Sequence, residues 1–227
     1  IWGLRKEPAI GVDPVTHAKD FRGASMWRDT DAVESWSWDG CEGSRTGVVV
    51  YADADTVLLL VNGRSVGRKK VKECKALFSK VTYEPGEIEA IALDAAGRET
   101  GRARLISATG ATKLKLSPER TLLRANGQDL CFLDIDLVGE NGVTRSSVDQ
   151  KLTVEVTGAG TLQAFGSARP HMAEDFVSQS HTTYYGKALA VIRAGYEPGE
   201  IRVKVSGKDM EEEITLRVTA DDSWEKM

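Results

Sequence analysis

Residues 56–70 read TVLLLVNGRSVGRKK, and this stretch decides the fold class. Two strand-like runs flank Asn62-Gly63, a pair that tolerates the positive φ angles of a type I′ turn between antiparallel strands. The first run is apolar and rich in Val and Leu, as strands with a buried face are. The stretch therefore predicts a β-hairpin, and every other asparagine of the chain also precedes a glycine.

The same pattern continues in both directions along the chain. Short runs rich in Val, Ile, Leu and Thr are bounded by Gly, Asp and Asn, and few long windows have a helical period. The segment most tolerant of helix, residues 173–179, is expected to be irregular or one short turn. The predicted strands are 46–52, 56–62, 64–70, 76–82, 87–94, 101–107, 113–117, 130–139, 152–157, 161–165, 182–185, 188–193, 201–206 and 213–218.

A hexapeptide occurs twice, because YEPGEI stands at residues 83–88 and again at 196–201. In each copy proline presets φ at the second turn position, and glycine accepts the positive φ that follows. The repeat indicates two copies of one architecture, each with about seven short strands in roughly 100 residues. The predicted fold is all-β, with two tandem immunoglobulin-like β-sandwich domains.

Composition shifts suggest the domain boundaries. Residues 1–34 contain two prolines and few strand signals, so we expect an extended N-terminal lead-in whose apolar side chains need a partner surface. The first sandwich is predicted over 35–109 and the second over 110–220, with a tail at 221–227. Exposed apolar residues in the lead-in would also let the chain pair with itself as a homo-oligomer. These residues are Trp2, Phe21, Met26 and Trp27.

Composition also argues against several classes of function. Thirty basic and 34 acidic residues give a net charge of −4, whereas nucleic-acid binders usually have a basic surplus. The apolar runs are far shorter than the roughly 18 residues that a membrane span needs. We therefore expect neither nucleic acid nor membrane as a partner.

Cysteine and histidine are sparse and lack the spacings that metal sites use. No CxxC or HExxH-like motif occurs, so we predict small buried thiols, no metal site and no cofactor. In LCFLDIDL at 130–137, the alternation points Cys131 inward and Asp134 and Asp136 outward. The cysteines and histidines are Cys41, Cys74, Cys131, His17, His171 and His181.

Two charged segments are expected to be solvated. Residues 211–213, three consecutive glutamates, are predicted to form an exposed turn between strands. The basic residues of 64–72 would share one face of an edge strand and discourage strand-to-strand aggregation. They are Arg64, Arg68, Lys70 and Lys72.

The stretch SWSWDGCEG at 35–43, then Val50-Tyr51 and VLLLVNGRSVG at 57–67, resembles the first β-sandwich after the catalytic barrel in glycoside hydrolase family 2. Residues 1–8 look like the segment that leaves that barrel. The second half is similar to the carboxyl-terminal immunoglobulin-like domain of the family, and to bacterial invasin-type modules. Its matching residues are 129–130, 141–142, 158–160, 166–170, Glu174 and 186–190.

The resemblance implies a parent enzyme that is a retaining glycosidase, with β-galactosidase as the best-known activity and β-glucuronidase and β-mannosidase as sisters. Retaining hydrolysis needs two carboxyl groups about 5–5.5 Å apart. The resemblance places both in the barrel that should precede Ile1, and no residue here matches their motifs. No catalytic residue is therefore assigned. The chain is expected to be an inactive accessory region that covers the barrel, sets the oligomer or lines the outer substrate site.

Trp36 and Trp38 are the first candidates for contacting carbohydrate. Being two residues apart, they would share one face of a strand and could form an aromatic platform for a sugar ring. In the other interpretation they pack, with Trp27, against the lead-in, the barrel or the sandwich core.

The loop at residues 166–174 is the second candidate, because loops at sandwich ends often carry binding residues. It either contacts carbohydrate or the barrel, or it simply caps the core. Ser167-Ala168 stands where many relatives of the family have Asn-Gly, which puts in doubt a contact that the loop makes elsewhere. The candidate residues are Ser167, Pro170, His171 and Glu174.

Two other functions stay open. The chain could be an autonomous carbohydrate-binding module, or an adhesion protein built from invasin-type immunoglobulin-like repeats. Free cysteines and the lack of a signal segment favour the cytoplasm, while a secreted or periplasmic location stays open. The sequence does not name the sugar, the linkage or the oligomeric state.

Overall fold

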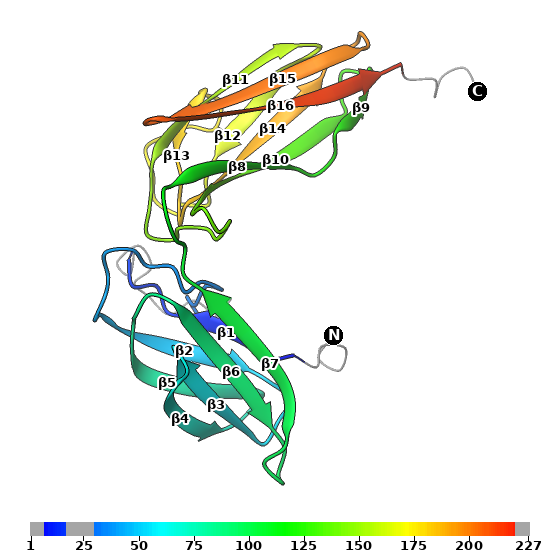
Figure 1. The fold of residues 1–227 in the computed structure, drawn as a ribbon. Coiled ribbons are helices and arrows are strands. Elements are labelled where there is room, and N and C mark those ends of the chain that lie inside the picture. Colours follow the sequence, from blue (N-terminus) through cyan, green and yellow to red (C-terminus); the bar gives the residue numbers. More distant parts are fainter. Residues whose placement is uncertain (1–6, 17–29, 221–227) are drawn as a thin grey trace, which may run out of the picture. The chain divides into compact units, whose positions relative to one another are not determined.

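The computed structural model describes residues 7–16 and 30–220, and strands dominate them (Figure 1). The chain divides into two compact units, residues 1–108 and 109–227. In the described residues, unit 1 contains β1 (Ala9–Val12), β2 (Arg45–Tyr51), β3 (Thr56–Val61), β4 (Arg64–Lys70), β5 (Lys75–Thr82), β6 (Glu87–Leu93) and β7 (Glu99–Ile106). Unit 2 contains β8 (Lys113–Pro118), β9 (Leu122–Arg124), β10 (Leu130–Val138), β11 (Lys151–Gly158), β12 (Gly160–Gly166), β13 (Ser180–Thr182), β14 (Lys187–Ala194), β15 (Gly199–Gly207) and β16 (Met210–Thr219).

Unit 1 has two antiparallel sheets, one in the order β1-β2-β5 and the other in the order β4-β3-β6-β7. Along β3, Val57, Leu59 and Val61 are buried, whereas Leu58 and Leu60 are only half-buried. This period of two is that of a strand with one face on the core. The strand order is that of an immunoglobulin-like sandwich, as predicted.

The hairpin predicted over residues 56–70 is confirmed. β3 and β4 pair antiparallel around Asn62 and Gly63, whose φ angles are 49° and 73°. Positive φ at both central residues defines a type I′ turn. The Asn62 side chain also accepts a hydrogen bond from the Glu87 amide at 2.8 Å and donates to the Pro85 carbonyl at 3.1 Å. The turn is thereby tied to the start of β6.

Two strands were not among those predicted. β1 lies in the segment expected to be an extended lead-in, yet it pairs with β2 from Ala9 opposite Tyr51 to Val12 opposite Val48. Four residues between two prolines carry too little alternation to be recognised. β9 has three residues and pairs parallel with β16. The predicted tail and most of the lead-in's apolar residues, including Trp27, lie outside the described residues.

A β-bulge at Val66 interrupts the pairing of β3 with β4. One extra residue inverts the period-two alternation of side chains beyond it. Arg64, opposite the buried Val61, therefore lies on the other face from Arg68 and Lys70. The expectation that the three share one face is wrong for Arg64. β4 is exposed at every position other than Gly67, in keeping with a solvated edge.

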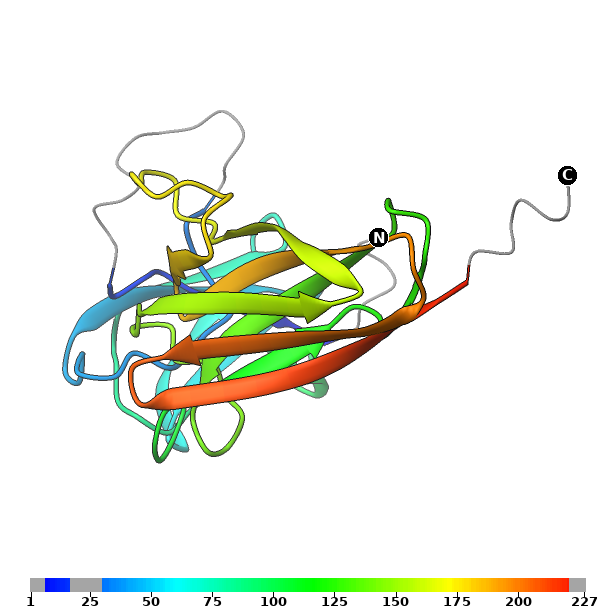
Figure 2. The same ribbon diagram turned by 90° about the horizontal axis from the view of Figure 1, so that it is seen from above.

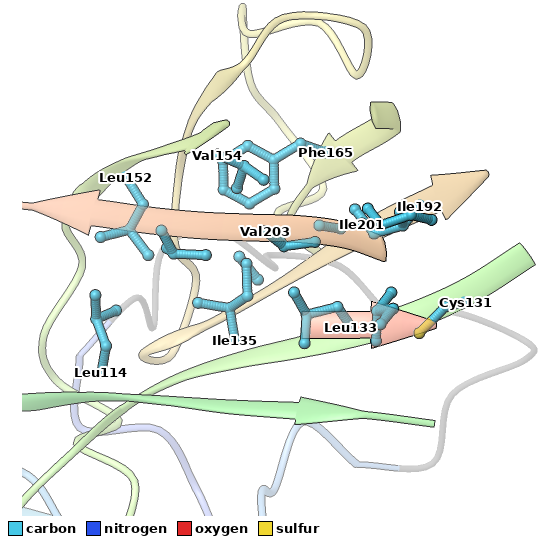
Figure 3. Close-up of a cluster of buried hydrophobic side chains, with 14 of the residues drawn as sticks. Leu114, Cys131, Leu133, Ile135, Leu152, Val154, Phe165, Ile192, Ile201 and Val203 are labelled. Carbon is cyan, nitrogen blue, oxygen red and sulfur yellow. The ribbon is translucent and has the colours of Figure 1, made fainter. Parts of the chain in front are cut away.

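Unit 2 has a four-stranded sheet, β12-β14-β10-β8, and a five-stranded sheet, β13-β11-β15-β16-β9. Their inner faces supply one buried cluster, in which β10 contributes Cys131, Leu133 and Ile135 (Figure 3). Cys131 is fully buried and points inward as predicted. The prediction of buried thiols is wrong for Cys74, which is exposed, and Cys41 is only half-buried.

Two further segments can be compared with their predictions. Residues 171–179 form neither helix nor strand, as expected. Residues 211–213 were predicted as a turn, but β16 begins at Met210 and includes them. The three glutamates are nevertheless exposed, and β9 pairs only with the far end of β16, at Arg217 to Thr219. Among the described residues, no helix is long and apolar enough to cross a membrane.

Each copy of the repeated hexapeptide joins strands of opposite sheets. The first connects β5 to β6 and the second connects β14 to β15, which are equivalent positions in the two sandwiches. The prediction of two copies of one architecture is therefore confirmed. The copies differ in detail, because Gly86 has a φ of 128° whereas the φ of Gly199 is not positive. Their tyrosines differ more, because Tyr83 is 1% exposed and Tyr196 is 77% exposed.

Candidate functional site

The two tryptophans singled out in the sequence lie inside unit 1. Trp36 and Trp38 are both 0% exposed. The Trp36 indole N–H donates to the Glu84 carbonyl at 3.0 Å, and its ring meets the Tyr83 ring edge-on at 5.0 Å between centroids. A ring without an exposed face cannot stack on a sugar. The platform interpretation is therefore wrong for these rings, and packing within unit 1 describes their surroundings.

The segment that carries these tryptophans ties distant parts of unit 1 together. The Trp38 amide donates to the Tyr83 hydroxyl at 3.1 Å, and burial raises the pKa of that hydroxyl. The Ser107 hydroxyl donates to the Trp36 carbonyl at 2.5 Å, and the Ala108 amide donates to the Ser37 hydroxyl at 3.1 Å. Residues 35–38 therefore hold the ends of β5 and β7 against the core.

The remaining candidates lie in the β12–β13 loop, which we define as residues 167–179. It is drawn in yellow in Figure 2 and lies at the end of unit 2 where β14 begins. The Phe165 amide donates to the Phe176 carbonyl at 2.8 Å, and the Val154 amide donates to the Gln179 carbonyl at 2.8 Å. These bonds fix both the middle and the end of the loop to the sandwich.

Glu174 faces the sandwich and anchors the loop to β13. Its carboxylate accepts hydrogen bonds from the Thr182 amide at 3.0 Å and the Thr182 hydroxyl at 2.9 Å. The Nδ1 atom of the fully buried His181 lies 3.6 Å from the same carboxylate. Partial burial by itself raises the pKa of Glu174, but the bonds from Thr182 and the charges of His181 and Lys151 outweigh it. The pKa of Glu174 is therefore lowered from 4.5.

Acid should release this anchor. A carboxylate with a lowered pKa in the folded state stabilises it above the unfolded pKa of about 4.5, and this contribution is lost as the pH falls through the folded value. The Thr182 amide proton resonance should therefore move as the pH falls from 6 to 3. Glu174→Gln keeps one acceptor without the charge, so its Thr182 resonance should move much less. Equal titration curves in both proteins would contradict the assignment.

His181 forms the floor of the β12–β13 loop. Its ring lies between Phe165, edge-on at 6.0 Å, and Phe176, parallel at 5.8 Å between centroids. Its Nδ1 is 3.0 Å from the Thr182 carbonyl, and its buried Nε2 has no hydrogen-bond partner among the described residues. Nothing in the sequence distinguished this histidine from the other two.

Phe176 and Val177 are features of the loop that were not predicted. They are 52% and 82% exposed. A Cβ added to Gly166 would lie 2.3 Å from the Phe176 ring, so only glycine at position 166 lets the ring lie there. The predicted site at residues 166–174 ends two residues before this aromatic. The dipeptide Phe-Val inside a polar stretch was the available signal.

The structure separates the other predicted loop residues. Pro170 and His171 are exposed, whereas Ser167 is half-buried, and its hydroxyl has no hydrogen-bond partner in the described part of the chain. Between them, the Arg169 guanidinium lies over the Tyr184 ring at 5.9 Å. Pro170, His171, Phe176 and Val177 are therefore among the exposed residues of the loop. Contact of Ser167, Pro170, His171 or Glu174 with carbohydrate stays a prediction.

Carboxylates are the groups to inspect for hydrolytic chemistry. Asp13 is the one described carboxyl group with a raised pKa, first through burial and then through the charge of Asp31. It borders a groove of about 330 Å³ over β2 and β5, which Thr30 and Tyr51 also line. Asp94 instead has a lowered pKa, because the Arg98 amide, the Arg98 guanidinium and the Ala96 amide all donate to its carboxylate. In the described ranges, no three His, Cys, Asp or Glu side chains are grouped to hold a metal ion.

The described residues define a class of all-β proteins with two immunoglobulin-like sandwiches, and comparisons with known proteins narrow that class. Residues 114–216 match the family described as glycoside hydrolase family 2 C-terminal domain 5. Residues 43–101 match a domain of unknown function, DUF4982. Unit 2 is therefore a C-terminal domain of glycoside hydrolase family 2, and the chain resembles the C-terminal region of these enzymes, as expected from its sequence.

The individual relatives are much longer proteins. Beta-galactosidase BoGH2A of Bacteroides ovatus is 27% identical over 97% of this chain, which covers 26% of that protein. A crystal structure of a family 2 member from Bacteroides cellulosilyticus has a TM-score of 0.83 and 29% identity over 96% of this chain and 29% of its own. Another, from strain DSM 14838, has a TM-score of 0.79 and 30% identity over 92% of this chain and 28% of its own. The chain thus spans about a quarter of the curated relative.

Proposed function

We propose that the chain is the non-catalytic accessory region of a family 2 glycoside hydrolase that acts as a β-galactosidase. The observation that carries the proposal is the similarity of almost the whole chain to about a quarter of a beta-galactosidase. The catalytic barrel of the parent enzyme would be the principal partner of this region.

The interior of each unit supports a structural role. Trp36 and Trp38, the aromatic candidates from the sequence, pack inside unit 1. The Glu174 carboxylate accepts its hydrogen bonds from Thr182, within unit 2. Two carboxylates of the β6–β7 sheet are paired too, since Arg102 bonds Glu89 and Glu99 at 2.8 Å each. Groups committed to internal partners stabilise a scaffold and are poorly suited to turnover.

A retaining glycosidase needs one ionised nucleophile and one protonated acid about 5–5.5 Å apart across the sugar. The pKa of Asp13 is raised, and its neighbour Asp31 comes from the segment that returns beside β1. However, Gly47 packs against the Asp13 carboxylate. An aryl β-galactoside assay of the isolated chain tests the proposal. We expect no release of the aryl group above the uncatalysed rate, and enzymatic turnover would overturn the proposal.

A further inference from the structure

Tyr196 is an exposed aromatic residue, and the chain contains an equivalent residue, Tyr83, with which it can be compared. In unit 1 the equivalent Tyr83 is covered by the edge-on ring of Trp36 and by the segment that carries it. In unit 2 the same hexapeptide makes the same sheet-to-sheet connection, yet Tyr196 is 77% exposed. The connection therefore does not require an exposed tyrosine, and the open ring is a specific feature of unit 2.

The Tyr196 ring rests on backbone. A Cβ added to Gly127 would lie 2.4 Å from the ring, and Gly127 has a φ of 69°, which favours glycine. The Gly127 amide donates to the Gly195 carbonyl at 3.0 Å, next to Tyr196 in the chain. The Asn126 side chain accepts from the amides of Gln128 and Asp129 at 3.0 and 2.9 Å. One face of the ring is thus held by a braced turn, and the other is open.

Exposed hydrogen-bond donors lie on the same segment as that turn. The Asp129 carboxylate accepts from the Arg120 guanidinium at 3.2 Å and from the Arg124 amide at 2.9 Å. Its side chain is 10% exposed, whereas those of Arg120 and Arg124 are 44% and 59% exposed. The Asp129 carboxylate orients both arginines. Each guanidinium has five N–H donors, and the carboxylate does not use all of them. Guanidinium donors beyond these bonds therefore remain on the segment whose Gly127 contacts the Tyr196 ring.

A sugar ring suits this combination. Its C–H face packs on an aromatic ring, and its hydroxyls accept hydrogen bonds at the rim of the contact. We propose that Tyr196 is a stacking platform for a pyranose ring of a glycan, with Arg120 and Arg124 as donors to its hydroxyl groups. The platform lies at the end of β14 opposite the β12–β13 loop. It does not depend on the activity proposed for the parent enzyme.

Binding of the 227-residue chain to galactosides, glucuronides and plant polysaccharides tests the platform, with isothermal titration as the readout. We expect saturable binding to at least one glycan. Tyr196→Ala should weaken it about tenfold, the loss expected for one aromatic contact, while Tyr196→Phe should bind like the unchanged protein. Both substitutions are at an exposed side chain, so circular dichroism should show unaltered folding.

Phe176→Ala is the matched control, because it removes another exposed aromatic ring of unit 2 and should leave glycan binding unchanged. Three results would overturn the platform. They are a flat response across the panel, equal affinity of the Tyr196→Ala variant, and loss of binding only in the Phe176→Ala variant. None of these results bears on whether the chain itself hydrolyses a galactoside, which the aryl β-galactoside assay measures separately.

Discussion

Trp36→Ala is expected to destabilise unit 1 by about 3–5 kcal/mol, the usual cost of deleting a fully buried large aromatic. The substitution removes a ring that is 0% exposed, its hydrogen bond to the Glu84 carbonyl and its edge-on contact with Tyr83. Denaturant unfolding of the 227-residue chain, followed by hydrogen exchange of β3 amides for unit 1 and β10 amides for unit 2, measures the effect. Only the β3 amides should lose protection.

Tyr83→Phe separates the ring from its hydroxyl. Phenylalanine keeps the edge-on contact with Trp36 but removes the oxygen that accepts from the Trp38 amide, so we expect a loss of about 1–3 kcal/mol. A Trp36→Ala effect below 1 kcal/mol would mean that the indole is dispensable for packing. The interpretation of residues 35–38 as an internal tie would then be wrong.

Phe165→Ala should have a comparable effect on unit 2, about 3–5 kcal/mol. Phe165 is 0% exposed and lies in the core cluster. Its ring and the His181 ring meet edge-on, with 6.0 Å between their centroids. Loss of its ring should also loosen the β12–β13 loop that His181 underlies. Thermal unfolding gives the stability change, and the Phe176 amide and ring resonances report on the loop.

Phe176→Ala serves as the control for the loop. Its ring is 52% exposed, so its removal should cost about 1 kcal/mol or less while still changing the loop resonances. If both substitutions destabilised unit 2 equally, Phe176 would be part of the core rather than a cover over His181. If Phe165→Ala left the loop resonances unchanged, the coupling through His181 would be refuted.

Most of the fold could be predicted from local sequence patterns. The Asn62-Gly63 turn fixed the β3–β4 hairpin, because positive φ at both positions allows few other structures. The alternation in LCFLDIDL placed Cys131 in the core. β1 was not predicted, because a strand of four residues between prolines can be recognised only from the strand with which it pairs. The bulge at Val66 was not predicted either, because a register shift is a property of two paired strands and not of one.

The candidate site was less predictable, since exposure is a property of tertiary structure. Trp36 and Trp38 attract attention in the sequence, and both are buried. Tyr83 and Tyr196 stand in identical hexapeptides, and only one is covered, because Trp36 has no counterpart over the second copy. Glu174 was correctly placed in a loop at the sandwich end, but its orientation toward Thr182 depends on β13.

Turnover of an aryl β-galactoside by the purified 227-residue chain tests the central claim most directly. The chain should be produced in a host without its own β-galactosidase, and Asp13→Asn should be assayed beside it. An accessory region gives no release of the aryl group in either protein. Turnover by the unchanged chain that Asp13→Asn abolishes would contradict the account, because a catalytic carboxyl group would then lie in unit 1.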